Sequence, residues 1–352
     1  MQQKLMKNTA ICSVLFAIAA MAVILYVASI KVVEIADVAQ DEVDSRAKHE
    51  DAVSEEAKEE SLLTFSDSVP NTNYLCIPLK EGSSAESVTI ENHYMDKELW
   101  IIFSDDCTDF YKENKITGNQ EKIKSGSYDK NNRKTQLKFS LTGIYEYRSI
   151  LEENNLYIEF VPPKEMYDKI VVIDPAGGKD VFGSTANNLA EKNVTLKIAQ
   201  KLKTKLDATD IKVYYTRMDD AYPKEESRYS IANETKADML IRIQVDEDKD
   251  SKIYGTSTIY NENFFVPGFG NVELADLLER EVVTSISGKA IGLFASEDTD
   301  IVLESATVPA AAINVGYITN AQEEILLEKD DYLDKIASGI YNAIIKAYDM
   351  RN

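Results

Sequence analysis

Two patterns of apolar residues divide the chain, and the clearer one lies in its C-terminal half. Residues 169–174 form an almost continuous apolar run, as expected for a strand buried on both faces. Val194, Ile198, Leu202 and Leu206 then recur every four residues and predict one face of a helix. Further strands are predicted at residues 211–216 and 239–245, and further helices at residues 271–286 and 331–348. Alternating strands and helices predict a three-layer α/β domain with a mostly parallel or mixed sheet.

Residues 62–162 carry a different pattern, made of short alternating or apolar runs separated by turn-forming clusters. The runs lie at residues 74–79, 87–90, 99–103, 136–141 and 156–161. The clusters, at residues 81–84 and 129–132, are rich in Gly, Ser, Asn and Asp. Short strands at this spacing predict a small β-sandwich-like domain. Pro162-Pro163 marks the boundary to the α/β domain, which we place at residues 168–350.

The N-terminal residues predict a membrane anchor. Residues 10–30 are 21 residues without a charged side chain, a length that suits a bilayer-spanning helix. We expect the anchor over residues 10–33, with residues 1–9 as a cytoplasmic tail. Lys4 and the acids that follow the span favour a single-pass protein of the cell membrane whose folded domains lie outside the cell. A cleaved signal peptide is the alternative, although its apolar core would be only about 7–15 residues long.

The segment at residues 34–61 is predicted to be an acidic spacer. Residues 34–60 hold eleven acids and three bases and no Gly, Pro or aromatic residue, so they have little to bury. A solvated helix or extended stalk suits this composition, and a specific acidic docking site is the alternative. The whole chain has 60 acids against 39 bases and a net charge of −21. That balance argues against a nucleic-acid partner and disfavours polybasic contact with anionic lipid heads.

Two aspects of the predicted β domain depend on single residues. Cys76 and Cys107 lie within it at a separation compatible with one disulfide, but sequence does not establish the geometry. We favour two unpaired buried thiols. Trp100 and the tyrosines are expected to lie in the core rather than to stack on glycan.

The α/β domain carries five motifs in a fixed order. They are Asp174-Pro175-Ala176-Gly177-Gly178, Glu191-Lys192-Asn193, Thr216-Arg217-Met218-Asp219, residues 228–238 and residues 309–320. Together they resemble the motifs of zinc-dependent N-acetylmuramoyl-L-alanine amidases of type 3, which cleave peptidoglycan. The resemblance implies the amidase fold for this domain. It also implies that the β domain is an accessory module that binds cell wall or positions the enzyme.

The resemblance assigns roles to four positions. In the family, zinc is held by two histidines and a glutamate, and a second glutamate polarises the attacking water. Here only Glu191 matches a zinc ligand, while Ala176 or a gap and Gln244 replace the histidines and Asn314 replaces the second glutamate. The chain has two histidines, both well before this domain. Zinc favours His and Cys, and an amide has no basic site near neutral pH. We therefore expect no bound zinc, no other cofactor and no intact catalytic residue.

The carboxyl ends of the strands are the default binding site of an open α/β sheet. We expect a groove there, lined by Asp174, Glu191, Arg242, Gln244 and Asn314. Glu191 is expected to cap or hydrogen-bond at the helix N-terminus. Arg242 is expected to pair with Asp246 or Glu191, the alternative being contact with the carboxylate of a peptide. An oxygen-only cluster at these strand ends would suit Mg²⁺ or Ca²⁺ rather than Zn²⁺, and we consider such binding the weaker alternative.

Three functions follow from these observations. The leading one is a membrane-anchored, catalytically inactive amidase-like protein that binds peptidoglycan or a cell-wall-remodelling partner. The second is an active N-acetylmuramoyl-L-alanine amidase with rebuilt chemistry. The third is a structural protein of envelope assembly whose useful surface is the β domain or the spacer.

Overall fold

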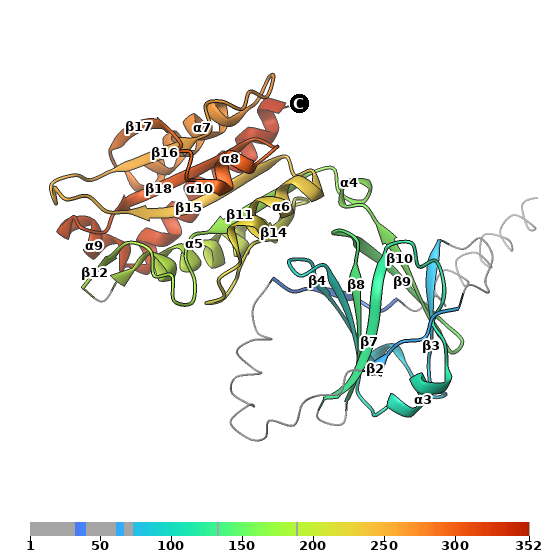
Figure 1. Ribbon diagram of the computed structural model, residues 1–352. Coiled ribbons are helices and arrows are strands. Elements are labelled where there is room, and N and C mark those ends of the chain that lie inside the picture. The colour runs from blue at the N-terminus through green and yellow to red at the C-terminus, as the bar shows by residue number, and fades with distance from the viewer. Residues whose placement is uncertain (1–31, 40–60, 67–72, 132–133, 188, 352) are drawn as a thin grey trace, which may run out of the picture.

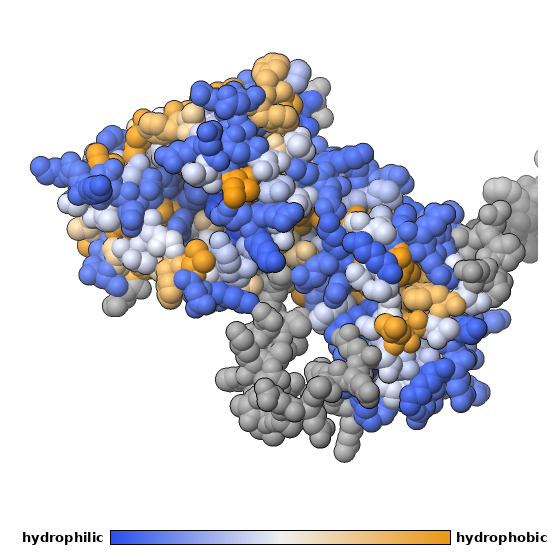
Figure 2. All heavy atoms as spheres, viewed as in Figure 1, coloured by the Kyte–Doolittle hydropathy of each residue, from blue (hydrophilic) through white to orange (hydrophobic). Residues whose placement is uncertain are grey.

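The computed structural model describes residues 32–39, 61–66, 73–131, 134–187 and 189–351. Along these residues a β-rich half ends at Val161 and an α/β half begins at Ile170, with the short helix α4 (Pro163–Met166) between them (Figure 1). Most of the molecular face in Figure 2 is hydrophilic over both halves, and apolar side chains gather only in small groups. Polar side chains thus cover most of this face of the molecule.

The β half consists of two sheets, in the strand orders β1-β4-β5-β8-β7-β2 and β6-β3-β10-β9. Their strands are β1 (Ile35–Asp37), β2 (Ser61–Leu62), β3 (Tyr74–Pro78), β4 (Val88–His93), β5 (Glu98–Phe103), β6 (Thr117–Gly118), β7 (Ile123–Asn131), β8 (Lys134–Leu141), β9 (Glu146–Glu152) and β10 (Asn155–Val161). Pairing is antiparallel throughout except between β1 and β4. Two short helices, η1 (Ala85–Ser87) and α3 (Thr108–Glu113), complete this half.

Alternate residues of the two sheets form one apolar cluster. Leu75 and Ile77 of β3 and Leu99 and Ile101 of β5 are fully buried in it, because every second side chain of a strand points to the same face. Tyr111 and Tyr128 also belong to this cluster, as predicted. The strand predictions at residues 74–79, 99–103, 136–141 and 156–161 are confirmed.

Two single-residue predictions for this half have different outcomes. Trp100 is half-buried on the face of β5 opposite the core, stacked on His93 with 3.8 Å between ring centroids, so its predicted core position is wrong. Its indole N–H donates to Glu98 over 2.7 Å. Cys76 and Cys107 are both free thiols, as we favoured, but of the two only Cys107 is buried and Cys76 is half-buried.

The N-terminal boundary of the β half differs from the prediction. Val33 is buried, and its N–H and C=O bond to the Ser149 hydroxyl at 3.1 and 2.6 Å. Strand β1 pairs with β4, with Ile35 opposite Ile90. The predicted spacer therefore starts and finishes on the same half, because residues 32–39 and 61–66 both belong to it. The physical reason is that the apolar side chains of Val33 and Ile35 pack on the core.

The predicted cytoplasmic tail and almost all of the predicted anchor lie outside the described residues. Within the described ranges, no helix has both the length and the apolar character needed to cross a bilayer.

The α/β half is built on one mixed sheet in the order β14-β11-β15-β18-β16-β17. The strands are β11 (Ile170–Pro175), β14 (Lys212–Tyr215), β15 (Met239–Asp246), β16 (Thr256–Tyr260), β17 (Ala290–Ala295) and β18 (Ala310–Tyr317), with a small β12 (Thr185–Ala186) and β13 (Leu189–Ala190) ribbon beside them. All neighbours in the sheet run parallel except β16 and β18. The prediction that residues 170–174, 239–245 and 310–315 share one sheet is confirmed.

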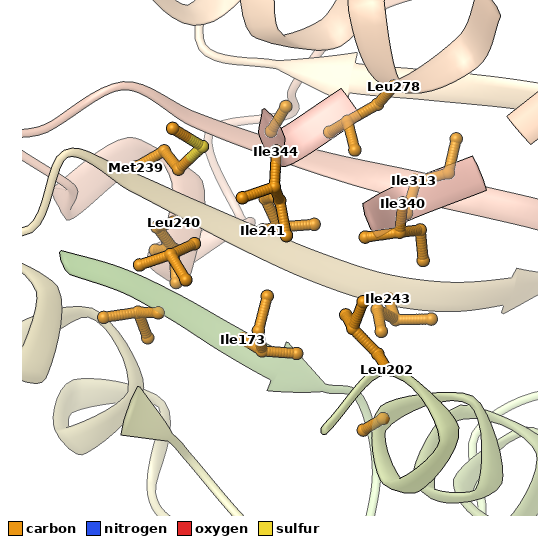
Figure 3. Packing of buried hydrophobic residues seen from close by; sticks show 14 of the residues in the cluster. Ile173, Leu202, Met239, Leu240, Ile241, Ile243, Leu278, Ile313, Ile340 and Ile344 are labelled. Atoms are coloured by element: carbon orange, nitrogen blue, oxygen red, sulfur yellow. The ribbon is translucent and has the colours of Figure 1, made fainter. Parts of the chain in front are cut away.

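Helices enclose this sheet. They are α5 (Glu191–Leu206), α6 (Glu225–Thr235), α7 (Asn271–Ile286), α8 (Ile301–Ser305), α9 (Ala321–Leu327) and α10 (Asp330–Arg351). Figure 3 shows Ile241 and Ile243 of β15 packed among Leu202 of α5 and Ile340 and Ile344 of α10. The chain crosses from β11 to β14 in one direction and returns past β11 to β15 in the other. This change of direction reverses the strand order beside β11. Because such crossovers are right-handed, α5 and α6 lie on opposite faces of the sheet.

The two halves meet at β14, the edge strand of the sheet. The Tyr94 hydroxyl donates to the Tyr215 carbonyl (2.8 Å) and accepts from the Tyr215 N–H (3.2 Å). Lys212 forms ion pairs with Asp37 (2.5 Å) and Glu146 (2.8 Å), both from the β half. These contacts involve segments far apart in the sequence, and sequence periodicity gave no signal for them.

Candidate functional site

Four of the five predicted groove residues lie in the carboxyl-terminal halves of β11, β15 and β18, where the strand order reverses, and the fifth, Glu191, begins α5. Asp174 stands opposite Arg242 in the register of β11 and β15, and Gln244 stands opposite Asn314 in the register of β15 and β18. Arg242 and Gln244 are two residues apart on one strand and so share a face of the sheet. The structure therefore brings these four predicted residues together.

Asp174 is the centre of a buried ionic cluster. Its side chain is 0% exposed and accepts from the Thr216 hydroxyl (2.5 Å), from Arg228 (2.5 Å) and from Arg242 (3.1 Å). Burial opposes ionisation, but the two guanidinium groups and the hydroxyl outweigh it and lower the pKa of Asp174 below its usual value. Arg242 thus pairs internally, as we favoured, but its partner is Asp174 rather than Asp246 or Glu191.

The Gly-rich turn after β11 is held by Arg228 and by a second buried arginine, Arg217. Arg228 donates to the carbonyls of Pro175 (3.1 Å) and Gly177 (2.9 Å), and Arg217 donates to those of Pro175 (2.9 Å) and Ala176 (2.7 Å). Gly178 has φ +129°, and a Cβ there would lie 2.0 Å from the Ala221 carbonyl. Sequence reasoning noted both arginines as motif residues but missed that they support this turn.

Glu191 begins α5 and bonds outward from it. One carboxylate oxygen accepts from the Ser184 N–H (3.1 Å) and the other from the Val245 N–H (3.0 Å), so Glu191 joins a loop to β15 rather than capping its own helix. Burial raises the pKa of Glu191, although both hydrogen bonds act against that rise. A Cβ on Gly183, whose φ is +68°, would lie 1.9 Å from this carboxylate. The backbone is thus closely fitted around both oxygens.

The amides at the remaining positions are partly satisfied. Asn314 is 2% exposed, and its Nδ2 donates to Asp246 over 2.7 Å. Its Oδ1 and the Nε of Arg242 are buried without a partner among the described residues. Gln244 is half-buried beside them. Asp174, Glu191 and Asn314 lie beneath the surface, so the open groove expected here stays a prediction.

The donor set at these positions does not fit zinc. Glu191 supplies the one carboxylate at a position that resembles a zinc ligand, and both of its oxygens already accept backbone N–H groups. Ala176 offers no donor atom, and Gln244 and Asn314 offer neutral amides, whereas zinc sites use imidazole or thiolate. Across the described ranges, no three His, Cys, Asp or Glu side chains are grouped to hold a metal. His93, the histidine of those ranges, is on β4 and contacts Glu91.

Comparison with known proteins agrees with this fold. The sequence profile of the N-acetylmuramoyl-L-alanine amidase family matches residues 171–346, and the chain belongs to this family. The amidase LytC of Bacillus subtilis is 25% identical over 178 residues, which cover 51% of this chain and 35% of LytC. The germination-specific N-acetylmuramoyl-L-alanine amidase of the same organism is 29% identical over 199 residues, covering 51% of this chain and 80% of that protein.

A solved structure gives the same extent of similarity. The N-acetylmuramoyl-L-alanine amidase of Clostridium difficile 630 is 29% identical and aligns with a TM-score of 0.49 over 52% of this chain and 98% of its own. The family profile lies wholly within the α/β half. It matches about half of the chain, and the chain spans about a third of the length of LytC.

Proposed function

We propose that this protein binds peptidoglycan, or a protein that remodels it, at the membrane surface without hydrolysing the amide between N-acetylmuramic acid and L-alanine. The observation that carries the proposal is the double engagement of Glu191 by backbone N–H groups. A carboxylate held in this way acts as a structural acceptor. Family membership supports peptidoglycan as the ligand class.

Amide hydrolysis needs an activated water, a proton acceptor and an electrophile for the developing oxyanion. The position that resembles the family's proton acceptor holds Asn314, whose amide cannot take up a proton near neutral pH. Positions 176 and 244 lack the imidazoles through which the family holds zinc. Because these groups act as a unit, their joint loss should leave little rate beyond binding effects.

One observation supports hydrolysis as a second function. The carboxylate of Asp246 accepts from Asn314 and lies at the carboxyl end of β15, so it is a candidate substitute for the missing proton acceptor. Family membership is equally compatible with this alternative.

The partner and location belong to the same proposal. The predicted anchor at residues 10–33 would hold the protein in the cell membrane, with the folded halves on the outer side. The CwlD amidase of Clostridioides difficile, 24% identical to this chain, has been solved in complex with the GerS lipoprotein. We therefore include an envelope protein as a candidate partner beside the glycan itself.

The test combines a binding assay with a turnover assay on the full-length chain. We expect the protein to sediment with purified peptidoglycan and to release no new alanine amines, with or without added zinc. The germination-specific amidase of Bacillus subtilis serves as the active control. Turnover abolished by Glu191→Ala, or stoichiometric zinc lost with that change, would overturn the proposal. Turnover abolished by Asp246→Ala would favour the second function.

A converse experiment tests the role of the substituted positions. The changes Gln244→His and Asn314→Glu, with a histidine inserted beside Ala176, restore the residue types that the family resemblance implies. We expect the variant that carries both substitutions and the inserted histidine to bind zinc. Hydrolysis is expected only in this variant, because the substitutions alone leave the turn one residue shorter than in the family.

A further inference from the structure

A hollow of about 680 Å³ lies at the junction of the two halves, and none of the residues that line it belongs to the Asp174 cluster. Residues 37–39 and Tyr94 line it from the β half, and the end of α5 and strand β14 line it from the α/β half. Its apolar wall includes Leu206, Ile211 and Met218. This size and this place between domains are typical of sites that bind small ligands.

The outer edge of β14 faces the β half at this junction (Figure 1). The Lys212 N–H donates to the carbonyl of Lys169, just before β11, and the Thr216 N–H to that of Ile173 in β11, over 3.0 Å each. In a parallel pair, alternate residues direct their N–H and C=O groups to opposite sides of the strand. The backbone groups of Val213 and of the odd-numbered residues on either side of it therefore point away from β11, towards the β half.

Side chains already satisfy the edge on both sides of Val213. The Ile211 N–H donates to the Thr209 hydroxyl over 3.3 Å. The Tyr94 hydroxyl accepts a hydrogen bond from the Tyr215 N–H and donates one to the Tyr215 carbonyl. Val213 is left between them with no neighbouring strand on that side among the described residues. The edge thus offers one position at which an extended peptide can form a pair of main-chain hydrogen bonds.

A buried hydroxyl adds a third polar group. Tyr215 lines the hollow and is 5% exposed, and its hydroxyl has no hydrogen-bond partner among the described residues. Burial raises the pKa of Tyr215 well above its usual range, so this group remains a neutral donor. A buried hydroxyl without a partner is uncommon and is satisfied when a ligand carbonyl approaches it.

The charges of the lining favour a cationic ligand. Four aspartates line the hollow against two lysines: Asp37, Asp207, Asp210 and Asp219, with Lys203 and Lys212. Lys203 pairs with Asp207, and Lys212 with Asp37. Asp219 accepts the Ala221 N–H over 2.6 Å and has no ion pair among the described residues. Asp210 pairs with Lys169, which lies outside the lining. Asp219 is thus the lining carboxylate without an ion pair among the described residues, and an amine that reaches it would form one.

We propose that the junction hollow binds a short, extended peptide that carries a primary amine. The peptide main chain pairs with Val213, one of its carbonyls accepts from the Tyr215 hydroxyl, and its amine lies at Asp219. This site includes neither Glu191 nor the Asp174 cluster and does not depend on the function proposed for them. The segment at residues 40–60 is an unsuitable occupant, because it holds nine acids and three bases.

The probe is the blocked tetrapeptide acetyl-Ala-Ala-Lys-Ala-amide, whose lysine side chain is its one charge, titrated into the full-length chain by ligand-detected NMR. We expect saturable binding that is lost when the lysine is acetylated. Tyr215→Phe removes one hydrogen bond and should weaken binding by about two- to tenfold, with Asp219→Asn in the same range. Tyr147→Phe is the matched control, since it also removes a buried hydroxyl without a partner, but from outside this hollow, and should leave the affinity unchanged.

Three results would overturn the proposal. The first is no saturable binding of the lysine peptide by the wild-type chain. The second is equal binding of the acetylated peptide, or an affinity that neither Tyr215→Phe nor Asp219→Asn alters. The third comes from a variant in which a Gly-Ser segment of equal length replaces residues 40–60. If the peptide binds only to that variant, the chain's own acidic segment occupies the site.

Discussion

Two ionic clusters in this protein, each built around a buried central charge, are opposite in design. In the α/β half, one carboxylate, Asp174, is shared by two cations, Arg228 and Arg242. At the junction of the halves, one cation, Lys212, is shared by two carboxylates, Asp37 and Glu146. Burial raises the pKa of Glu146 even though Lys212 acts against that rise, whereas the two arginines lower the pKa of Asp174.

The two clusters differ in whether a group that loses its counter-ion can be neutralised by binding a proton. A carboxylate that loses its cation can bind a proton and become neutral, but a guanidinium that loses its carboxylate stays charged at any pH a protein experiences. The Asp174 cluster should therefore tolerate loss of its central charge less well than the junction does. Four predictions test this comparison.

The largest effect is expected for Asp174→Ala. It leaves Arg228 and Arg242, which are 1% and 12% exposed, as buried charges without a counter-ion. We expect the free energy of unfolding to fall by about 3–5 kcal/mol in urea denaturation at pH 7. Asp210→Ala removes an exposed carboxylate paired with Lys169 and should cost far less, because exposed ion pairs add little stability. A loss for Asp174→Ala as small as that of the control would refute the proposed difference.

A smaller loss that depends on pH is expected for Lys212→Met. We expect about 2–3 kcal/mol at pH 7, because Glu146 stays buried without its cation. A carboxyl whose folded pKa is raised binds protons more tightly when folded, so the variant should regain stability as pH falls through that pKa towards about 4.3. Urea denaturation at pH 7 and pH 5 measures this, with the exposed Lys112→Met as the control. A loss that does not shrink at pH 5 would contradict protonation as the source of relief.

The junction also has a neutral link, which Tyr94→Phe removes. The variant leaves the N–H and C=O of Tyr215 without the hydroxyl that now bonds both. We expect a loss of about 1–2 kcal/mol in thermal or urea unfolding. Tyr147→Phe, which removes a hydroxyl without a partner, should change stability by no more than about 0.5 kcal/mol. Equal effects of the two changes would show that the Tyr94 bridge contributes nothing.

The smallest effect is expected for Glu191→Gln. The glutamine amide can accept one of the two N–H groups but presents its own donors to the other, so the wild type should be the more stable protein at pH 4. The folded pKa of Glu191 is raised by burial. The free energy of unfolding of the wild type therefore falls as pH rises through that pKa, whereas that of the variant does not. The difference between the two proteins should narrow by about 1 kcal/mol or less between pH 4 and pH 7. A difference that grows as pH rises would mean that folding stabilises Glu191 as the anion, which contradicts the prediction. Glu328→Gln, at an exposed position, reports any effect of the substitution itself.

The sheet of the α/β half was predictable because its signal is local. Residues 170–174 and 239–245 are apolar runs of strand length, and the periodic helix faces between them leave few alternative arrangements. The partner of Arg242 was not predictable in this way. It depends on the register between β11 and β15, which sets Asp174 opposite Arg242 and is a property of the folded sheet.

The N-terminal boundary shows a different limit. Averaged over residues 34–60, composition predicts a solvated spacer, yet Ile35 near its beginning and Val33 just before it pack on the β core. Their partners, Ser149 and Ile90, lie far along the chain, so no window of local sequence contains both sides of the contact. The junction hollow escaped prediction for the same reason, since its walls come from both halves.

Strand β1 has a mechanical consequence. It pairs with β4 over residues 35–37, and Asp37 at its end forms an ion pair with Lys212 of the α/β half. Tension applied from the N-terminal side along β1 strains its hydrogen bonds side by side, in shear, before it reaches the Lys212 contact. Because Asp37 belongs to β1, tension that pulls this strand away from β4 would also break its ion pair with Lys212 and so remove one contact between the halves.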